Sequence, residues 1–502
     1  MIVFILYEIC SMEKHVLSKS TFIKGMQCKK ALYYHKYRKE LRDDLTAAQE
    51  AIFKQGTEVG ELAQKLFPSG VDCTPESYFD FQEAVIRTQE EIEKGTRVIY
   101  EAAFQFNGVL AALDILVKHE DGWRAYEVKS STKVSETYEF DASIQYYTIV
   151  NSEIDLKDIS IVHINNEYTK NGPIDVHELF TIESVWEQVQ NNIPKIPEQV
   201  RRLKEVLELT DEPVIDIGTH CSSPYACDFS GHCWKHIPDY SIFDISRLRA
   251  DKKFDLYGRN VIQFKDIPED YPLNENQWMQ VKSELNNETF IDEVAIQQFV
   301  RELNYPIYHL DFETFATAVP VFDGSRPYQQ LVFQYSLHIE YADGTLEHKE
   351  YLAPSDGKDP RNGLIEHLVA DCGKSGDVLV YNISFERSKL LELNEYSSKY
   401  KFALLGIIDR LKDLMVPFRD RRYYTPEMQG SYSIKKVLPA LVPELNYQAL
   451  TIQEGGTASN TYAEMVRGVY QGDIEQTRKD LLAYCELDTL AMVKILEVLK
   501  QV

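Results

Sequence analysis

The sequence predicts an α/β protein with two sheet-containing domains and a helical connector between them. Its 502 residues exceed one ordinary domain, since domains average roughly 150 residues. Hydrophobic residues make up 44% of the chain and charged residues 26%, which is a globular composition with material for buried cores. Two separate regions combine strand-like and helical patterns, as sheets covered by helices do. We therefore expect domains at 12–240 and 306–502, with the connector at 241–305.

The first domain is predicted to contain a β-hairpin between helical segments. Residues 109–119 and 123–131 are strand-like runs rich in apolar residues. Glu120-Asp121-Gly122 separates them and predicts a turn, with glycine available for a positive φ. Helical periodicity flanks the hairpin over residues 17–100, 135–150 and 180–208.

A second pattern of strands and helices begins at Pro306. Residues 307–315 predict a strand that enters a polar loop, and residues 377–384 predict a short buried strand. Between them, Ala342-Asp343-Gly344 separates two strand-like runs and predicts another hairpin. Helical patterns follow to residue 502. This order predicts a mixed sheet covered by helices.

The sequence predicts a cytoplasmic protein without a membrane span. It contains no run of about 18 apolar residues, the length that a spanning helix needs. The apolar start at residues 2–10 lacks a basic leader and a small-residue cleavage site, so we expect no signal peptide, and Met12 is an alternative start. Eight cysteines in 502 residues are too few for a disulfide framework, which favours metal binding or core packing.

One group of cysteines has a spacing that suggests a bound metal group. Cys221, Cys227 and Cys233 lie within thirteen residues of a polar segment, and Cys28 lies far upstream. Such a loop suits a soft ion or an iron–sulfur cluster. A tetrahedral zinc site is the alternative, with ligands from His220, His232 or His236. The remaining cysteines are expected to be packing residues: Cys10, Cys73, Cys372 and Cys485.

The first hairpin carries a set of residues that could hold a divalent ion. Asp114 lies in its first strand, and Glu127 and Lys129 lie in its second. Alternation along a strand places Glu127 and Lys129 on one face, and adjacent strands bring Asp114 beside them. Carboxylates bind Mg²⁺, and a lysine can orient or activate water, as metal-assisted phosphodiester hydrolysis requires.

The order of these residues along the chain resembles RecB-like PD-(D/E)XK nucleases that carry an iron–sulfur cluster. In that family one cysteine precedes the nuclease core and three follow it, and together they bind a [4Fe-4S] cluster. The resemblance implies a restriction-endonuclease-like fold, with Cys28, Cys221, Cys227 and Cys233 as cluster ligands. It also implies metal ligation by Asp114 and Glu127, a catalytic Lys129, and Gln145 as the polar residue on the following helix. The family has a histidine on a glycine-rich helix, and this histidine is missing here. The corresponding segment at 56–66 has Glu58 and Glu61 instead.

A second set of acidic residues lies in the C-terminal domain. Asp311 and Glu313 share a face of the strand at 307–315. Glu386 follows the strand at 377–384, at the start of a helical pattern. Tyr484 and Asp488 are four residues apart on a predicted helix and therefore share a face. Asp409 and Asp413 are rival acids, which we place on an amphipathic helix facing solvent or nearby arginines.

This second set resembles the DEDDy 3′–5′ exonucleases of the RNase H-like fold. In that family four acids bind two divalent ions, Mg²⁺ or Mn²⁺, and a tyrosine positions the attacking water. The resemblance implies that the metal ligands are Asp311, Glu313, Glu386 and Asp488, and that Tyr484 orients water. The family usually has Asp where this chain has Glu386. A RecB-like half followed by a DEDD-like half also occurs together in a bacterial family.

The expected function is therefore that of a metal-dependent nuclease acting on single-stranded or end-containing nucleic acid, DNA rather than RNA. The formal net charge of −25 argues against a general duplex coat. Residues 19–42, however, contain eight Lys and Arg against one acid, and 401–436 contain eight against four. Tyr423 and Tyr424 lie in the second stretch and offer rings for base stacking. The alternative is a nucleic-acid-binding adaptor or defence component with silent catalytic centres. Protein partners in repair or defence fit either hypothesis.

Overall fold

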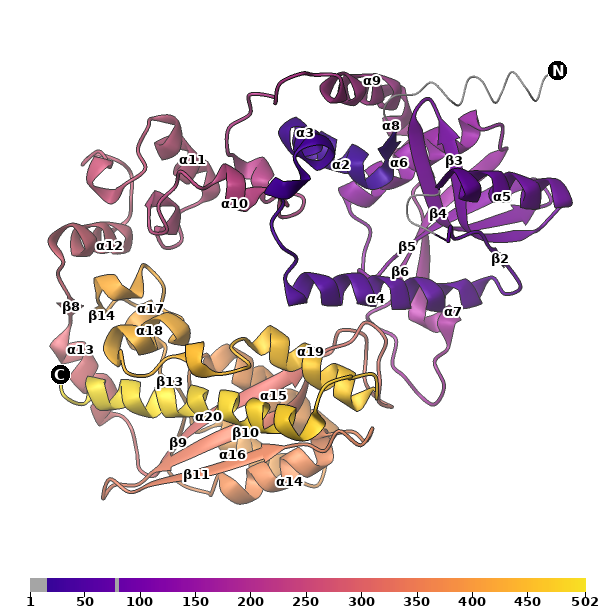
Figure 1. Ribbon diagram of the computed structural model, residues 1–502. Helices are drawn as coiled ribbons and strands as arrows, with labels where there is room; N and C mark the ends of the chain where they lie inside the picture. The colour runs from indigo at the N-terminus through magenta and orange to yellow at the C-terminus, as the bar shows by residue number, and fades with distance from the viewer. Residues whose placement is uncertain (1–15, 77–80) are drawn as a thin grey trace. The chain divides into compact units, whose positions relative to one another are not determined.

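The computed structural model describes residues 16–76 and 81–502 (Figure 1). The apolar start, Met12 and Cys10 lie outside the described residues. The chain divides into two compact units, which are described separately. The first unit extends to His236 and also includes residues 318–327, and the second comprises residues 237–317 and 328–502. No helix in the described parts of the chain is long and apolar enough to cross a membrane.

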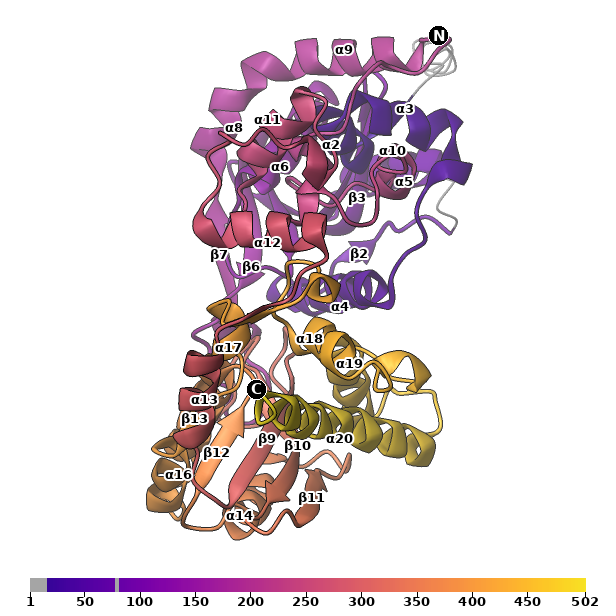
Figure 2. The ribbon, with the colours of Figure 1, turned by 90° about the vertical axis from the view of Figure 1, so that its left-hand side faces the viewer.

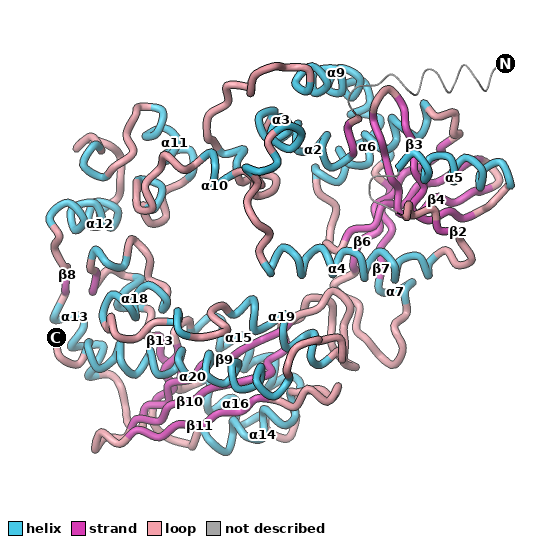
Figure 3. Tube along the Cα trace, in the orientation of Figure 1, coloured by secondary structure: helices cyan, strands magenta, loops and turns pink. Residues whose placement is uncertain are grey.

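The first unit is built on a mixed sheet in the order β2-β3-β4-β5-β6-β7, with β1 paired to β4 (Figure 3). Pairs β3–β4, β4–β5 and β6–β7 are antiparallel, whereas β5 and β6 are parallel. The predicted hairpin is confirmed as β4–β5, with Gly122 at a φ of 146°. The strands are β1 (Leu17–Ser18), β2 (Val71–Asp72), β3 (Val98–Phe106), β4 (Val109–His119), β5 (Gly122–Lys129), β6 (Leu156–Ile164) and β7 (Phe180–Ser184).

Helices surround this sheet, and α6 contributes to two buried clusters. On α6, Ile144 packs with the N-terminal helices and α9, whereas Ala142 and Ile149 pack with β3–β6. The prediction of helix over 180–208 is wrong for its first residues, because 180–184 pair with β6 as an edge strand. The helices are α2 (Lys19–Gln27), α3 (Lys29–Tyr37), α4 (Ala47–Ala63), α5 (Phe81–Lys94), α6 (Glu136–Asn151), α7 (Val176–Leu179), α8 (Trp186–Asn192), α9 (Ile196–Leu207) and α10 (Ser230–Cys233).

Residues 241–305, expected as a helical connector, belong to the second unit and have a small core of their own. Ile242, Ile245, Leu256 and Val281 are buried there together. Helix α12 begins with a capping box, in which the Asn274 side chain accepts a hydrogen bond from the Gln277 backbone amide. The elements are α11 (Ala250–Gly258), α12 (Glu275–Asn286), β8 (Phe290–Ile291) and α13 (Glu293–Arg301).

The remainder of the second unit is a mixed sheet in the order β11-β10-β9-β12-β13. Strands β9, β10 and β11 are antiparallel neighbours, and β12 runs parallel to both β9 and β13. The predicted strand at 307–315 and the hairpin after it are confirmed. The strands are β9 (Ile307–Phe315), β10 (Leu331–Glu340), β11 (Leu346–Leu352), β12 (Asp377–Val380) and β13 (Leu411–Asp413), while β14 (Tyr423–Tyr424) pairs with β8.

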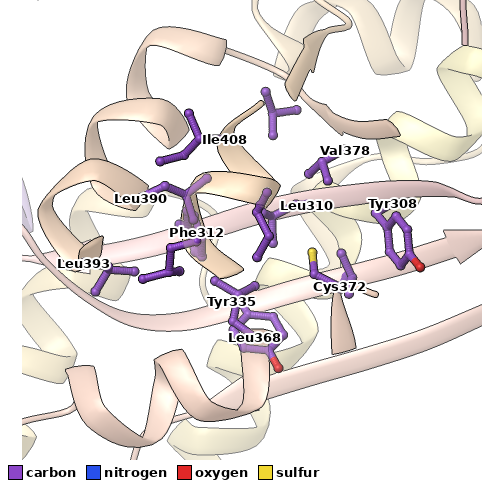
Figure 4. Packing of buried hydrophobic residues seen from close by; sticks show 14 of the residues in the cluster. Tyr308, Leu310, Phe312, Tyr335, Leu368, Cys372, Val378, Leu390, Leu393 and Ile408 are labelled. Atoms are coloured by element: carbon purple, nitrogen blue, oxygen red, sulfur yellow. The ribbon is translucent and has the colours of Figure 1, made fainter. Parts of the chain in front are cut away.

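The two faces of this sheet have different chemistry. On one face Leu310, Phe312 and Tyr335 pack against helices α14, α15 and α16 (Figure 4). Helix α20 lies along the opposite face (Figures 1 and 2), where alternation places Asp311 and Glu313. Acidic side chains are thus held between the sheet and a long helix. The helices are α14 (Arg361–Asp371), α15 (Ile383–Tyr396), α16 (Lys401–Ile408), α17 (Val416–Arg419), α18 (Ile434–Leu441), α19 (Gly455–Val466) and α20 (Ile474–Leu499).

Candidate metal centres and a cysteine cavity

The structure brings the acids of the second unit together at β9 and α20. Glu313 and Asp488 are both buried, at 8% and 7% exposure. Asp488 lies one helical turn after Tyr484 on the face of α20 that meets the sheet. Oxygen atoms of Asp311 and Glu313 and the sulfur of Cys485 lie within 4.8 Å of one another. We call Asp311, Glu313, Glu386, Asp488 and Tyr484 the second carboxylate cluster.

Glu386 reaches this cluster from another element. It lies in the first turn of α15, immediately after β12, and is 3% exposed. Its charge raises the pKa of Asp311. Among the described residues, its buried Oε2 has no hydrogen-bond partner. A buried carboxylate oxygen without a partner is costly, and a bound cation would satisfy it.

Mutual repulsion and burial keep these acids from ionising easily. Burial, followed by the charges of Asp488, Glu313 and Glu386, raises the pKa of Asp311 well above its ordinary value. Burial, followed by the charge of Asp488, also raises the pKa of Glu313 well above its ordinary value. Burial raises the pKa of Glu386 to about 8. For Asp488, burial raises the pKa to about 6, although the Tyr447 hydroxyl, which donates to Oδ1 at 2.6 Å, opposes the shift.

Three residues that the sequence did not single out complete the surroundings of this cluster. Tyr447 donates to Asp488, as above. Lys435 lies with its Nζ 5.4 Å from the ring centroids of both Tyr447 and Tyr484. A Cβ built on Gly455 would lie 3.7 Å from Glu313 Oε2 and 3.8 Å from the Tyr484 hydroxyl. Lys435 belongs to the basic stretch at 401–436, which was the available signal in the sequence.

The rival acid Asp413 is placed differently from its prediction, whereas Asp409 is exposed as expected. Asp413 ends strand β13, opposite Val380 of β12, and is only 9% exposed. It accepts from the Met415 amide at 3.0 Å and lies 3.4 Å from the Arg419 guanidinium. Its charge also raises the pKa of Glu386. Asp413 therefore borders the second carboxylate cluster, and only its expected arginine partner is confirmed.

Cys485 also differs from its expected role as a packing residue. Its thiol is buried and lies 3.9 Å from Asp311 Oδ2. Cys73 and Cys372 are buried in hydrophobic clusters, as expected of packing residues.

In the first unit, Asp114, Glu127, Lys129 and Gln145 also lie together, and we call them the first carboxylate cluster. Lys129 Nζ lies 2.9 Å from Glu127 Oε1 and 2.9 Å from Asp141 Oδ2. The Gln145 amide, from α6, donates to Glu127 Oε2 at 2.6 Å. Asp114 accepts from the Val128 amide, so its carboxylate is held against β5.

Lys19, at the start of α2, was not predicted and forms an ion pair with Glu127. Burial opposes ionisation of Glu127, but the charges of Lys129 and Lys19 outweigh it and hold the pKa at about 2. Asp114 behaves differently, because burial and then the charge of Glu127 raise its pKa to about 7. Glu127 is therefore charged without an added ion, whereas Asp114 is held against ionisation by burial and by the charge of Glu127.

Glu101 is a further acid that the sequence analysis missed. The β3–β4 register places it opposite Asp114, and it has a positive φ of 52°. Burial and then the charge of Asp114 raise its pKa to about 8. The available signal was Asn107-Gly108, a two-residue turn that fixes this register, and both residues have positive φ.

The four predicted cysteines line one cavity of the first unit, with a volume of about 190 Å³. Cys28 lies between α2 and α3, and the other three come from the segment at 221–233. All four are free and partly exposed. Burial, and then the charges of Cys28, Cys221 and Cys233, raise the pKa of Cys227 to about 11. Four thiols around one cavity offer ligands for a soft metal ion or for a cluster of several atoms. His220 and His236 also line the cavity, so zinc ligands are available.

The two basic stretches are partly used within the fold. Lys19 and Lys24 pair with Glu127 and Asp228, and Lys30 lies 3.5 Å from Glu212. Tyr424 is fully buried, and its hydroxyl oxygen accepts a hydrogen bond from the Gly430 amide at 3.0 Å. The expectation that Tyr424 offers a ring for base stacking is therefore wrong.

A family model described as a domain of unknown function, DUF2779, matches residues 308–433. An uncharacterised protein of Ureaplasma parvum is 30% identical over 232 residues, which are 42% of this chain and 33% of that protein. An uncharacterised protein of Mycoplasma pneumoniae is 30% identical over 207 residues, which are 37% of this chain and 31% of that protein. The chain thus spans about a third of the length of these curated relatives. The family match includes Asp311, Glu313 and Glu386 and ends before α20.

Proposed function

We propose that the second unit is a metal-dependent 3′–5′ exonuclease of the DEDDy type with an RNase H-like fold. The observation that carries the proposal is the convergence of Asp311, Glu313, Glu386 and Asp488 beside Tyr484. The mixed sheet with an antiparallel β9–β10–β11 edge supports the fold assignment. Two divalent ions, Mg²⁺ or Mn²⁺, would stabilise the attacking and leaving oxygens of an in-line displacement.

The residues of this chain have distinct roles in that reaction. The four carboxylates hold the cations through oxygen ligands, which Mg²⁺ prefers. Burial and the charge of Asp488 raise the pKa of Tyr484, so its hydroxyl keeps a proton and can orient a water molecule. Tyr447 fixes one oxygen of Asp488 by its hydrogen bond. Lys435 supplies a positive charge near the cluster.

Cleavage of end-labelled single- and double-stranded DNA and RNA tests the proposal. We expect Asp311→Ala to lower 3′-end trimming roughly a thousandfold, because metal coordination contributes several kcal/mol to the transition state. Asp480→Asn is a matched control on α20, since this acid hydrogen-bonds Gln476 two turns before Asp488. Unchanged trimming by folded Asp311→Ala would contradict the proposal. The same panel decides whether DNA is preferred to RNA.

We further propose that the first unit is a RecB-like PD-(D/E)XK module with a second nuclease centre. Support comes from Asp114, Glu127 and Lys129 on adjoining strands, with Gln145 hydrogen-bonded to Glu127. Lys129→Ala should remove cleavage that persists in Asp311→Ala. If no such cleavage exists, the alternative of a nucleic-acid-gripping module with a silent centre is favoured.

The cysteine cavity of the first unit supports the proposal of a [4Fe-4S] cluster held by Cys28, Cys221, Cys227 and Cys233. Such a cluster would join two distant segments of the chain. We expect iron and acid-labile sulfide in the purified protein and their loss in Cys227→Ser. Stoichiometric zinc without iron would instead indicate a zinc site with cysteine and histidine ligands.

A further inference from the structure

A pair of histidines lies on the sheet of the second unit beyond the second carboxylate cluster. The strand registers place His338 of β10 opposite His309 of β9 and His348 of β11. The rings of His338 and His348 are stacked, with centroids 4.4 Å apart and an interplanar angle of 26°. Two imidazoles from different strands are thus fixed side by side under α20.

One nitrogen of each ring is held by a hydroxyl group. His338 Nδ1 lies 2.8 Å from Thr489 Oγ1, and His348 Nε2 lies 2.9 Å from Ser336 Oγ. The two hydroxyls are themselves 2.7 Å apart. Metal-binding histidines commonly use one ring nitrogen in this way, because the hydrogen bond fixes the ring orientation and leaves the other nitrogen for the ion.

A carboxylate completes a set of three ligands. Glu486 of α20 has Oε1 3.8 Å from His348 Nδ1. Nitrogen atoms of the two histidines and an oxygen of Glu486 all lie within 4.8 Å of one another. Glu486 and Asp488 are two residues apart on a helix, which turns them by about 200° relative to each other. Glu486 therefore points away from the second carboxylate cluster.

We propose that His338, His348 and Glu486 form a separate site for a transition-metal ion of the zinc type. Two imidazole nitrogens and one carboxylate oxygen suit Zn²⁺, whereas an all-carboxylate set suits Mg²⁺ or Mn²⁺. His338 is buried at 4% exposure, and the Glu486 side chain is 48% exposed. One end of the site is thus packed against the sheet and the other is open to solvent, which gives an ion a route of entry.

Zinc binding by the full-length chain tests the proposal by calorimetric titration with elemental analysis of the bound metal. The variants are His348→Ala and Glu486→Gln, and His367→Ala is the control because His367 is an exposed histidine of the same unit outside the site. We expect both site variants to bind one zinc ion fewer, or to bind it roughly 100-fold more weakly. The control should match the wild type.

Cobalt separates this ion from one bound at the cysteines, because a nitrogen and oxygen site gives no thiolate charge-transfer band. The proposal is overturned if zinc number and affinity are unchanged in both His348→Ala and folded Glu486→Gln. It is also overturned if Asp311→Asn, rather than these variants, removes the ion, because the metal would then belong to the second carboxylate cluster. Neither result depends on nuclease activity.

Discussion

The two carboxylate clusters differ in what balances their charge. In the first cluster, Lys129 and Lys19 pair with Glu127 and hold its pKa at about 2. In the second cluster, burial raises the pKa values of Asp311, Glu313 and Asp488, and repulsion between carboxylates adds to the shift for Asp311 and Glu313. Lys435 only partly offsets that repulsion.

The first cluster therefore has a carboxylate that is neutralised by lysines of the fold, whereas the carboxylates of the second cluster would be neutralised by bound cations. Glu127 contributes to the stability of its unit without an added cation, because its partners are part of the fold. The second cluster reaches its fully ionised form most easily when cations bind, since metal ligands must lose their protons. Ionisation and metal binding are therefore coupled more strongly in the second unit.

Glu127→Gln should have the largest effect on stability. We expect it to lower the free energy of unfolding of the first unit by about 3 kcal/mol, because removing one partner of a buried ion pair leaves charge uncompensated. Urea denaturation followed by fluorescence measures the change. Glu120→Gln, in the exposed turn before β5, is the control and should change stability by less than about 0.5 kcal/mol. Equal effects of the two substitutions would show that the pairing of Glu127 contributes little.

The affinity of the second cluster for Mn²⁺ should rise with pH. Asp488, with a pKa of about 6, and Glu386, with a pKa of about 8, must lose protons to bind an ion. Displacing one proton predicts roughly a tenfold gain in affinity per pH unit between pH 6 and 8. Calorimetry in buffers of different ionisation enthalpy measures the released protons. Glu386→Gln should flatten the upper part of this profile, and a flat wild-type profile would contradict the coupling.

Asp311→Asn should have a smaller effect, and of opposite sign to that of Glu127→Gln. The folded-state pKa of Asp311 is raised, so its contribution to stability is present at acidic pH and is lost as pH rises through that pKa. Asparagine removes the repulsion, and we expect a gain of about 1 kcal/mol in metal-free protein at pH 8. The gain should disappear below about pH 4, where the unfolded aspartate is also protonated. Destabilisation at pH 8 would contradict this account.

Much of the second cluster could be predicted because its spacing is local. Alternation along β9 places Asp311 and Glu313 on one face, and one helical turn separates Tyr484 from Asp488. Asp413 was misplaced because β13 is only three residues long and forms by pairing with β12. Such a strand depends on a distant partner rather than on its own sequence pattern.

The first cluster shows the same division between local and distant signals. Lys19 follows β1, a two-residue strand that pairs with β4, and no local pattern predicts that pairing. Glu101 differs, because the turn at Asn107-Gly108 sets the register that places it opposite Asp114. The whole β3–β4 hairpin was therefore accessible from sequence, whereas Lys19 required the fold.

The junction between Cys28 and the segment at 221–233 has a consequence for the unfolded chain. The Gln27 side chain donates to the carbonyl oxygens of His220 and Tyr225, both at 2.7 Å, so protein contacts already join these segments. A group bound by the cysteines would turn this contact into a covalent loop of nearly two hundred residues. By analogy with a disulfide, closing a loop of that size removes conformational entropy of the unfolded chain equivalent to roughly 5 kcal/mol. The cysteines would then act as a cross-link that limits the dimensions of the first unit in its unfolded state.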